Sequence, residues 1–156
     1  MKARALAVFA VLALALAVAP LASAQKTLAD IKARGSLKCG VGVQSPAFAF
    51  ADEQGNYKGF DVEFCRATAA AVGVPVKFTQ TSAKERFPAL QSGEVDLLYR
   101  TTTITMSRDT KLGFDFSGVN YYDGQGFMVK KSLGVKAAKE LDGATVCVAT
   151  GTTTEL

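Results

Sequence analysis

The sequence contains no histidine and no tryptophan among its 156 residues. Histidine is the usual general base near neutral pH and the commonest metal ligand in proteins. Its absence excludes Ser/His/Asp and Cys/His hydrolases and most zinc sites, and no pair of carboxylates is placed together by the sequence alone. We therefore expect a binding protein rather than an enzyme, with no metal and no cofactor.

Long hydrophobic runs are also scarce, and the clearest one lies at the N-terminus. Residues 1–24 begin with Lys2 and Arg4, continue as an uncharged apolar run, and end in Ala22-Ser23-Ala24. This order is typical of a secretory signal peptide, and the run is shorter than the about 20 residues that span a bilayer. We predict cleavage after Ala24, with a membrane anchor as the alternative. No cysteine follows the run, so no covalent membrane anchor is expected.

Basic residues are too scattered for a nucleic-acid-binding surface. The formal charge of +4 falls to +2 when Lys2 and Arg4 of the predicted signal peptide are removed. The other basic residues do not cluster as a nucleic-acid footprint requires, and no second run could span a membrane. We expect a soluble, exported protein with no nucleic-acid partner.

The three cysteines, Cys39, Cys65 and Cys147, are an odd number, so one of them has no partner within the sequence. An exported protein can form disulfides. Cys39 lies in a predicted strand and Cys65 in the helix expected to pack after it, which favours a Cys39–Cys65 disulfide. Two separate buried thiols are the alternative. Cys147 is then either a buried strand residue or a thiol whose partner lies outside the sequence.

Predicted strands and helices alternate along the first two thirds of the chain. The expected elements are a helix at 27–34, a strand at 37–43, a hairpin or loop at 52–56, a helix at 62–72, a strand at 74–79, a helix at 82–91 and a strand at 95–99. Pro88 marks either the first turn of its helix or a kink. The alternation predicts an α/β fold with a parallel sheet and right-handed crossovers. Ligands bind such sheets outside the carboxyl ends of the strands.

The last third of the chain gives weaker patterns. They indicate a short helix at 107–110, an extended stretch at 119–129 that could cross between two lobes, a small helix at 135–141 and a strand at 144–149. Thr152 and Glu155 have the spacing of a capping box, which signals the start of a helix, yet no helix follows. We expect the sequence to be an N-terminal fragment, with an exposed tail as the alternative.

The densest group of polar residues directly follows the predicted strand at 95–99. It consists of Arg100, Thr101, Thr102 and Thr103, with Arg108 shortly beyond. Hydroxyl and N–H groups at the end of a strand can bind a small zwitterion, and arginine binds a carboxylate with a planar bidentate fork. The alternative is a Thr-rich solvated loop.

A second candidate site is the Gly-Thr-Thr-Thr stretch at 151–154. It precedes a predicted helix start, where free N–H groups and the helix dipole favour an anion. The stretch lacks the Gly-Lys-Thr of a phosphate-binding loop, so a carboxylate is the expected ligand. Ordinary helix capping is the alternative.

Several motifs of the chain occur in a recognisable order. They are Gly59-Phe60-Asp61-Val62, the stretch 90–96, Thr101-Thr102-Thr103, Ser107-Arg108, Phe116-Ser117, the stretch 120–127, the stretch 151–155, and the surroundings of Cys39 and Cys65. Together they resemble the periplasmic amino-acid-binding proteins of ABC transporters, solute-binding protein family 3. The resemblance is strongest to the general L-amino-acid type that binds glutamate, glutamine, aspartate and asparagine.

This resemblance implies a type II periplasmic-binding-protein fold, in which two α/β lobes close on a ligand like a hinge. It assigns 1–24 to the signal peptide, 25–123 to lobe one, 124–130 to the first hinge crossing and 131–156 to the start of lobe two. Most of the second lobe is then missing from the chain. A single lobe is expected to bind weakly, because closure gains its free energy from contacts with both lobes.

The resemblance also implies roles for individual residues. Arg108 would hold the α-carboxylate of the ligand, and Thr101 and Thr103 would contact its α-amino or carboxylate group. Thr153 would bind the carboxylate from the second lobe.

The implied ligand is an acidic amino acid or its amide. Gly42 and Ser45 stand where the cationic-amino-acid branch has an acidic and an aromatic residue, so a lysine or arginine specialist is not expected. Arg86 aligns with a position that meets the side-chain carboxylate in acidic-amino-acid binders, and Arg100 lies close to the threonines. For both arginines a surface salt bridge is the alternative. We expect binding of Glu, Asp, Gln or Asn, with broad tolerance.

The implied partners are a free L-amino acid and the membrane permease of an ABC transporter, and the implied state is a periplasmic monomer. Two other classes remain as alternatives. One is a periplasmic enzyme of the cyclohexadienyl dehydratase type on the same fold, which would need an acid to protonate a leaving hydroxyl. The other is the ligand-sensing domain of a receptor.

Overall fold

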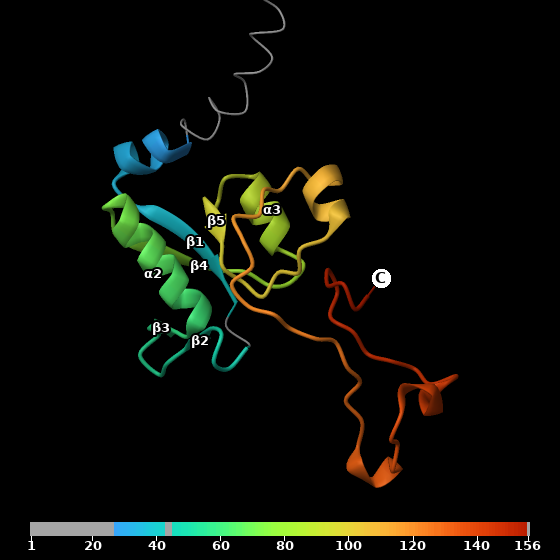
Figure 1. Cartoon of the computed structure of the whole chain (residues 1–156). Coiled ribbons are helices and arrows are strands. Elements are labelled where there is room, and N and C mark those ends of the chain that lie inside the picture. The colour runs from blue at the N-terminus through green and yellow to red at the C-terminus, as the bar shows by residue number, and fades with distance from the viewer. Residues whose placement is uncertain (1–26, 43–44, 156) are drawn as a thin grey trace, which may run out of the picture. The chain divides into compact units, whose positions relative to one another are not determined.

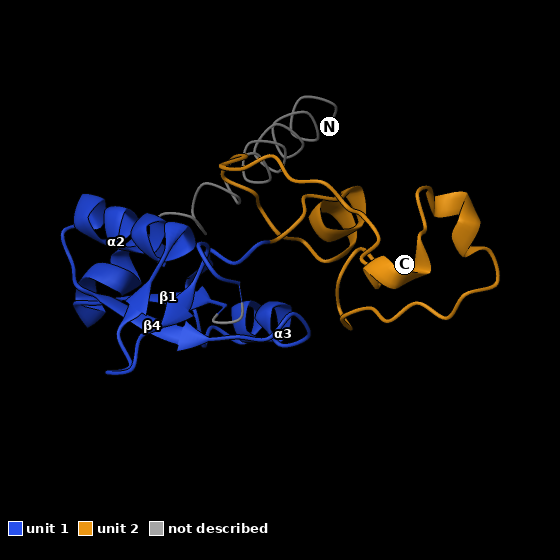
Figure 2. Ribbon diagram, turned by 90° about the horizontal axis from the view of Figure 1, so that it is seen from below, with its two compact units in different colours: residues 1–101 blue, residues 102–156 orange. Residues whose placement is uncertain are grey.

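The computed structural model describes residues 27–42 and 45–155 (Figure 1). The predicted signal peptide at 1–24 lies outside these described residues. The chain divides into two compact units, unit 1 at residues 1–101 and unit 2 at residues 102–156, which are coloured separately in Figure 2. Each is described by itself, and the division into lobes at 123 and 131 stays a prediction. Over the described ranges, no helix has the length and apolar character needed to cross a bilayer.

Unit 1 is organised around a three-stranded parallel sheet. The central strand β1 (Leu37–Val41) pairs in parallel with β4 (Val76–Gln80) on one side and with β5 (Leu97–Leu98) on the other. Most residues of β1 are buried, as is usual for a parallel strand that is covered on both faces. The expected parallel α/β arrangement is therefore confirmed, although β5 is shorter than the predicted strand at 95–99.

A disulfide joins the sheet to its neighbouring helix. Helix α2 (Phe60–Val72) contacts β1 and β4, and it ends at Gly73, which adopts the left-handed conformation with φ 81°. Cys39 of β1 and Cys65 of α2 are bonded, with their Cα atoms 6.0 Å apart. Both cysteines are fully buried in a cluster with Val41 and Val62. The predicted disulfide is confirmed, and it lies within the core of unit 1.

Helix α3 (Arg86–Gln91) begins later than the predicted helix at 82–91. Ser82 and Glu85 precede it with reciprocal bonds: the Glu85 N–H donates to the Ser82 hydroxyl, and the Ser82 N–H donates to the Glu85 carboxylate, each at 3.1 Å. This is the geometry of a capping box. Pro88 therefore lies in the first turn of the helix, where a missing N–H is tolerated.

A small antiparallel hairpin links β1 to α2. Its strands are β2 (Phe50–Ala51) and β3 (Tyr57–Lys58). Between them, the Asp52 carboxylate accepts the N–H groups of Gln54 at 3.1 Å and Asn56 at 2.8 Å, and it pairs with the Lys58 ammonium at 2.9 Å. The Lys58 bond and then the Asn56 N–H lower the pKa of Asp52 to about 2. The hairpin alternative predicted for 52–56 is confirmed.

The aromatic residues pack differently in the two units. In unit 1, the Tyr57 ring lies 5.3 Å from Phe78, and the Tyr99 ring stacks on Phe64 at 5.3 Å. In unit 2, the adjacent residues 121 and 122 are tyrosines whose side chains are exposed.

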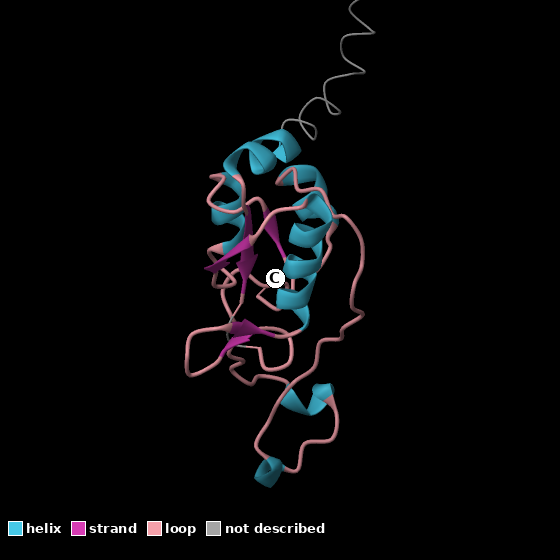
Figure 3. Ribbon diagram, turned by 90° about the vertical axis from the view of Figure 1, so that its left-hand side faces the viewer, coloured by secondary structure: helices cyan, strands magenta, loops and turns pink. Residues whose placement is uncertain are grey.

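Unit 2 consists mainly of loops (Figure 3). Its helical segments are the π-helix η1 (Ser107–Lys111) and the 3-10 helices η2 (Lys131–Leu133) and η3 (Ala138–Leu141). The short helix predicted at 107–110 is confirmed, and the helix predicted at 135–141 forms only in its second half.

The predicted strand at 144–149 is wrong. No strand forms in residues 102–155, so this segment has no neighbouring strand with which to exchange backbone hydrogen bonds. Cys147 is exposed and is not in a disulfide. Of the two alternatives given for Cys147, the buried strand residue is therefore wrong.

Candidate functional site

The structure gathers the predicted binding residues into two polar clusters, one in each unit. The Thr101 cluster in unit 1 comprises Asp61, Thr81, Arg86, Arg100 and Thr101. The Arg108 cluster in unit 2 comprises Thr103, Arg108, Gly151 and Thr153.

Thr101 lies shortly after β5, and its backbone has an unusual conformation. Its φ is 21°, a value that residues other than glycine rarely adopt. The guanidinium of Arg86 donates to its carbonyl at 3.1 Å, and Asp61 accepts its N–H at 3.2 Å. Arg86 is buried, and its guanidinium also lies over the Phe87 ring at 4.9 Å. The Thr101 peptide groups are thus held from both sides.

Arg100 extends along the end of the sheet. Its Nε donates to the Thr81 carbonyl at 2.8 Å, and its Nη1 lies 3.5 Å from the Thr101 hydroxyl. Its stem passes over Gly42, where an added Cβ would lie 3.4 Å from the Arg100 Cγ. A glycine at this position therefore leaves room for the arginine side chain.

Asp61 and Thr81 are the members of this cluster that the sequence did not identify as functional, and Asp61 is the charged one. Asp61 is 5% exposed in the first turn of α2. Burial raises its pKa, while the Thr101 N–H and the charge of Arg100 act in the opposite direction. Burial also lowers the pKa of Arg100, and Asp61 opposes that shift. The Gly-Phe-Asp sequence before an amphipathic helix was visible as a motif, but nothing local indicated the partner of its carboxylate.

Arg108 is the centre of the cluster in unit 2. It lies in η1 and is buried, and burial lowers its pKa. Its Nη1 donates to the Thr103 carbonyl at 2.6 Å, and its Nη2 donates to the Gly151 carbonyl at 3.4 Å. The hydroxyls of Thr103 and Thr153 lie 3.5 Å apart. Two predicted neighbours, Thr103 and Arg108, are therefore brought together with Thr153, which lies 50 residues from Thr103 in the sequence.

The capping box predicted for Thr152 and Glu155 does not form. The Thr152 hydroxyl donates to the Ala149 carbonyl at 2.6 Å, so it is used within the preceding turn. The Glu155 carboxylate instead accepts the Gly151 N–H at 2.7 Å. Glu155 thus satisfies a backbone donor of the turn at 151–154, and no helix begins in the described residues 151–155.

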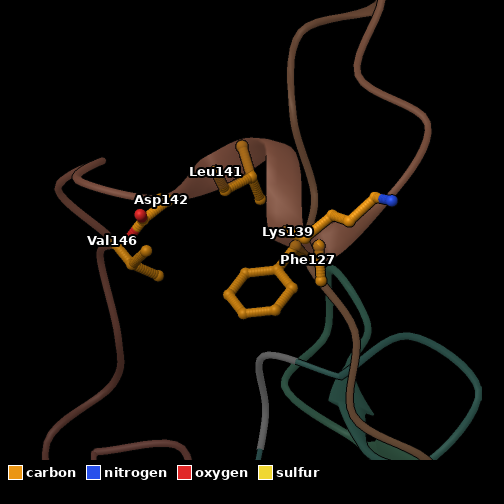
Figure 4. Close-up of a pocket in the computed structure, with 6 residues that line it drawn as sticks. Phe127, Lys139, Leu141, Asp142 and Val146 are labelled. Atoms are coloured by element: carbon orange, nitrogen blue, oxygen red, sulfur yellow. The ribbon is translucent and has the colours of Figure 1, made fainter.

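A separate hollow of about 370 Å³ lies in unit 2 (Figure 4). Its lining is mostly apolar and consists of Phe127, Ala138, Lys139, Leu141, Asp142 and Val146. None of the predicted binding residues lines it. Within 27–42 and 45–155, no group of three or more cysteine and acidic residues is placed to hold a metal ion.

Residues 37–150 match the bacterial extracellular solute-binding proteins, family 3. The general L-amino acid-binding periplasmic protein AapJ of Rhizobium johnstonii is 59% identical over 144 residues, which cover 90% of this chain and 42% of AapJ. The glutamate/glutamine/aspartate/asparagine-binding protein BztA of Rhodobacter capsulatus is 60% identical over 153 residues, which cover 96% of this chain and 45% of BztA.

A solved structure is also similar. It is an ABC transporter periplasmic binding protein from Brucella ovis with glutathione bound, at a TM-score of 0.76 and 55% identity. The match covers 83% of this chain and 42% of that protein. The chain spans less than half the length of AapJ and of BztA.

Proposed function

The chain belongs to the bacterial extracellular solute-binding proteins of family 3, as its motif order predicts, and we propose that it captures free L-amino acids for an ABC transporter. The observation that carries this proposal is the Arg108 cluster, in which a buried guanidinium lies beside Thr103 and the 151–153 turn. The relatives with 51–60% identity are amino-acid-binding proteins, which favours binding over catalysis and leaves the dehydratase-like alternative unsupported.

The Arg108 cluster has the chemistry to hold an α-carboxylate. Arginine binds carboxylates with two parallel N–H donors. One of its bonds, to the Gly151 carbonyl at 3.4 Å, is long and can be exchanged for a stronger charge-assisted bond to a ligand. The hydroxyls of Thr103 and Thr153 can then donate to the same carboxylate.

The Thr101 cluster supplies the remaining contacts that we propose. As the family resemblance implies, the Thr101 hydroxyl would accept from the α-amino group of the ligand. Arg100 would meet the side-chain carboxylate or amide. The contact expected between Arg86 and a ligand carboxylate stays a prediction, and the burial of Arg86 favours an indirect contribution through the Thr101 carbonyl.

The proposed ligands are glutamate, glutamine, aspartate and asparagine. The name of BztA describes this set, and that of AapJ describes a general L-amino-acid binder. The Brucella ovis protein holds glutathione, whose glutamyl end also presents a free α-amino group and α-carboxylate. We propose a periplasmic, monomeric protein in which hinge closure of two lobes presents the amino acid to a membrane permease.

The first test is a nuclear magnetic resonance titration of the ¹⁵N-labelled 156-residue chain. The ligand panel is L-glutamate, L-glutamine, L-aspartate, L-asparagine and glutathione, with D-glutamate and L-lysine as controls. We expect weak, saturable amide shifts for the L-amino acids of the proposed set, confined to 100–108 and 151–153. Arg108→Ala should weaken binding at least about tenfold, because a buried charged partner contributes about 2–5 kcal/mol.

The matched control is Lys111→Ala, which removes an exposed cation from the same π-helix. It should bind like the wild type. Equal shifts with D-glutamate, or equal affinity of the Arg108→Ala and wild-type chains, would contradict the proposed function.

A further inference from the structure

Backbone strain in the described residues gathers around the start of α2. Apart from glycines, only Ala47 and Thr101 have positive φ among the residues that the structure describes, at 71° and 21°. Both are bonded to the residues that open this helix. Such strained positions persist only where the surroundings over-determine them, and they cluster at functional sites.

The first strained residue is held by the backbone at the helix start. The Phe60 N–H donates to the Ala47 carbonyl, and the Asp61 N–H donates to the Phe48 carbonyl, each at 2.9 Å. Gly59 makes this close approach possible. Its φ is 124°, and an added Cβ would lie 2.4 Å from the Phe48 carbonyl oxygen.

The second strained residue is held by the Asp61 side chain. The carboxylate accepts the Thr101 N–H at 3.2 Å, while Arg86 holds the Thr101 carbonyl at 3.1 Å. Asp61 therefore connects the loop at 45–49 and the segment after β5, although 40 residues of sequence separate Asp61 from Thr101.

We propose that Asp61 is a positioning residue of the amino-acid site, and that it fixes Thr101 in the strained conformation from which its hydroxyl and backbone face the ligand. Asp61 itself does not contact the ligand. The ligand part of this inference rests on the proposed function, whereas the control of the Thr101 backbone does not.

The burial of the carboxylate supports a functional reason for its presence. Burial raises the pKa of Asp61, which means that folding favours its protonated form. The stability contributed by the protonated group is fully present below the ordinary value of 3.8 and is lost as the pH rises through the raised pKa, so burial makes ionisation costly. An isosteric asparagine keeps an acceptor for the Thr101 N–H and removes that cost.

The experiment compares the wild-type chain with Asp61→Ala, Asp61→Asn and the control Glu63→Ala. Glu63 is an exposed acid in the same first turn of α2. The readouts are hydrogen exchange and the φ-dependent coupling constant of the Thr101 amide, the thermal unfolding midpoint, and the L-glutamate titration. Of these readouts, only the titration uses a ligand.

We expect Asp61→Ala to speed exchange of the Thr101 amide about tenfold or more, since a bond to a charged acceptor is lost. The amides of Val62 and Cys65 should keep their protection, and L-glutamate binding should weaken by a similar factor. Asp61→Asn should restore both the Thr101 protection and the affinity. It should unfold at a temperature no lower than the wild type at pH 7, and Glu63→Ala should change neither Thr101 readout.

Two results would overturn the inference. One is an Asp61→Ala chain whose Thr101 amide keeps its protection and its coupling constant. The other is a loss of protection that spreads equally over α2, because that pattern describes a general structural role. If Asp61→Ala alters Thr101 but binds L-glutamate as the wild type does, the positioning role is also contradicted. A wild-type chain that does not respond to L-glutamate contradicts the proposed function instead.

Discussion

Unit 1 and unit 2 are each stabilised by a different kind of interaction, although one continuous chain forms both. Unit 1 has a parallel sheet, a buried disulfide and a core that includes Leu37, Val41 and Val62. In the described part of unit 2, the buried residues are Phe114 and Arg108. Apolar burial therefore organises the first unit, whereas hydrogen bonds to backbone carbonyls organise the second.

The described part of unit 2 carries the Arg108 cluster, but it lacks the apolar core that stabilises unit 1. Large hydrophobic side chains are mostly exposed in unit 2, including Tyr122, Met128 and Leu133. Arg108 connects η1 to the 151–153 turn there without a hydrophobic core around it. We expect unit 1 to unfold as a cooperative body and unit 2 to open at a much lower free energy.

Removal of the Cys39–Cys65 disulfide should have the largest effect on this comparison. Its 26-residue separation corresponds to about 3.5 kcal/mol of unfolded-chain entropy. The double variant Cys39→Ser and Cys65→Ser should therefore lose most of its amide exchange protection in β1 and α2, as measured by nuclear magnetic resonance. Exchange in unit 2 should be unchanged.

The matched control for this test is Cys147→Ser, which alters an exposed cysteine that is not in a disulfide. Its exchange protection in unit 1 should equal that of the wild type. If the double variant and this control are equally stable, the disulfide does not organise unit 1.

A pair of leucine truncations should give the next largest effect. Leu37→Ala removes a side chain that is 1% exposed, and it should lower the free energy of unfolding of unit 1 by about 3 kcal/mol. Leu133→Ala removes a side chain that is 64% exposed, and it should change stability by less than about 0.5 kcal/mol. Urea denaturation followed by circular dichroism measures both values. Similar losses for the two variants would show that unit 2 has a core comparable to that of unit 1.

Acidification should give the smallest effect, at the exposed hairpin of unit 1. The pKa of Asp52 is lowered from 3.8 to about 2, so its bonds stabilise the hairpin fully above pH 3.8. That contribution is lost as the pH falls through about 2. Amide shifts of Gln54 and Asn56 should titrate with this low midpoint, while the shifts of the β1 amides stay constant. Asp52→Asn should abolish the titration, and a midpoint near 3.8 would disprove the bonded geometry.

Local patterns were sufficient to predict most of unit 1. These patterns are local: strand and helix periodicity, the glycine after α2, and the placement of Cys39 in a strand and Cys65 in a helix. The parallel pairing of β1 with β4 and β5 follows from the alternation of these elements. The observed ends of α3 and β5 differ from the predicted ones, because element ends depend on capping bonds and strand partners, which residue type alone does not define.

Two predictions were wrong for a physical reason: the strand at 144–149 and the helix start at Thr152. A strand exists through hydrogen bonds to another strand, and no strand in residues 102–155 offers them. Thr152 has the residue type of a helix cap, but its hydroxyl donates to Ala149 instead. At 144–149 the local preference for a strand had no partner strand, and at Thr152 the preference for a helix cap was replaced by the bond to the Ala149 carbonyl.

The candidate site shows the same division. Arg108, Thr103 and Thr153 were predicted, and the structure groups them. Asp61 was missed as a functional residue because its role depends on Thr101, which lies 40 residues away. A buried carboxylate becomes informative only when its hydrogen-bond partner is known.

The placement of the four tyrosines has a practical consequence for spectroscopy. The sequence has no tryptophan, so tyrosine dominates its intrinsic fluorescence. Tyr57 and Tyr99 lie against phenylalanine rings in unit 1, whereas Tyr121 and Tyr122 are exposed in unit 2. Incorporation of 3-fluorotyrosine would thus place two fluorine nuclei in each unit without any substitution. Ring currents from Phe78 and Phe64 would displace the first pair of resonances, which lets a single ¹⁹F spectrum distinguish the two units.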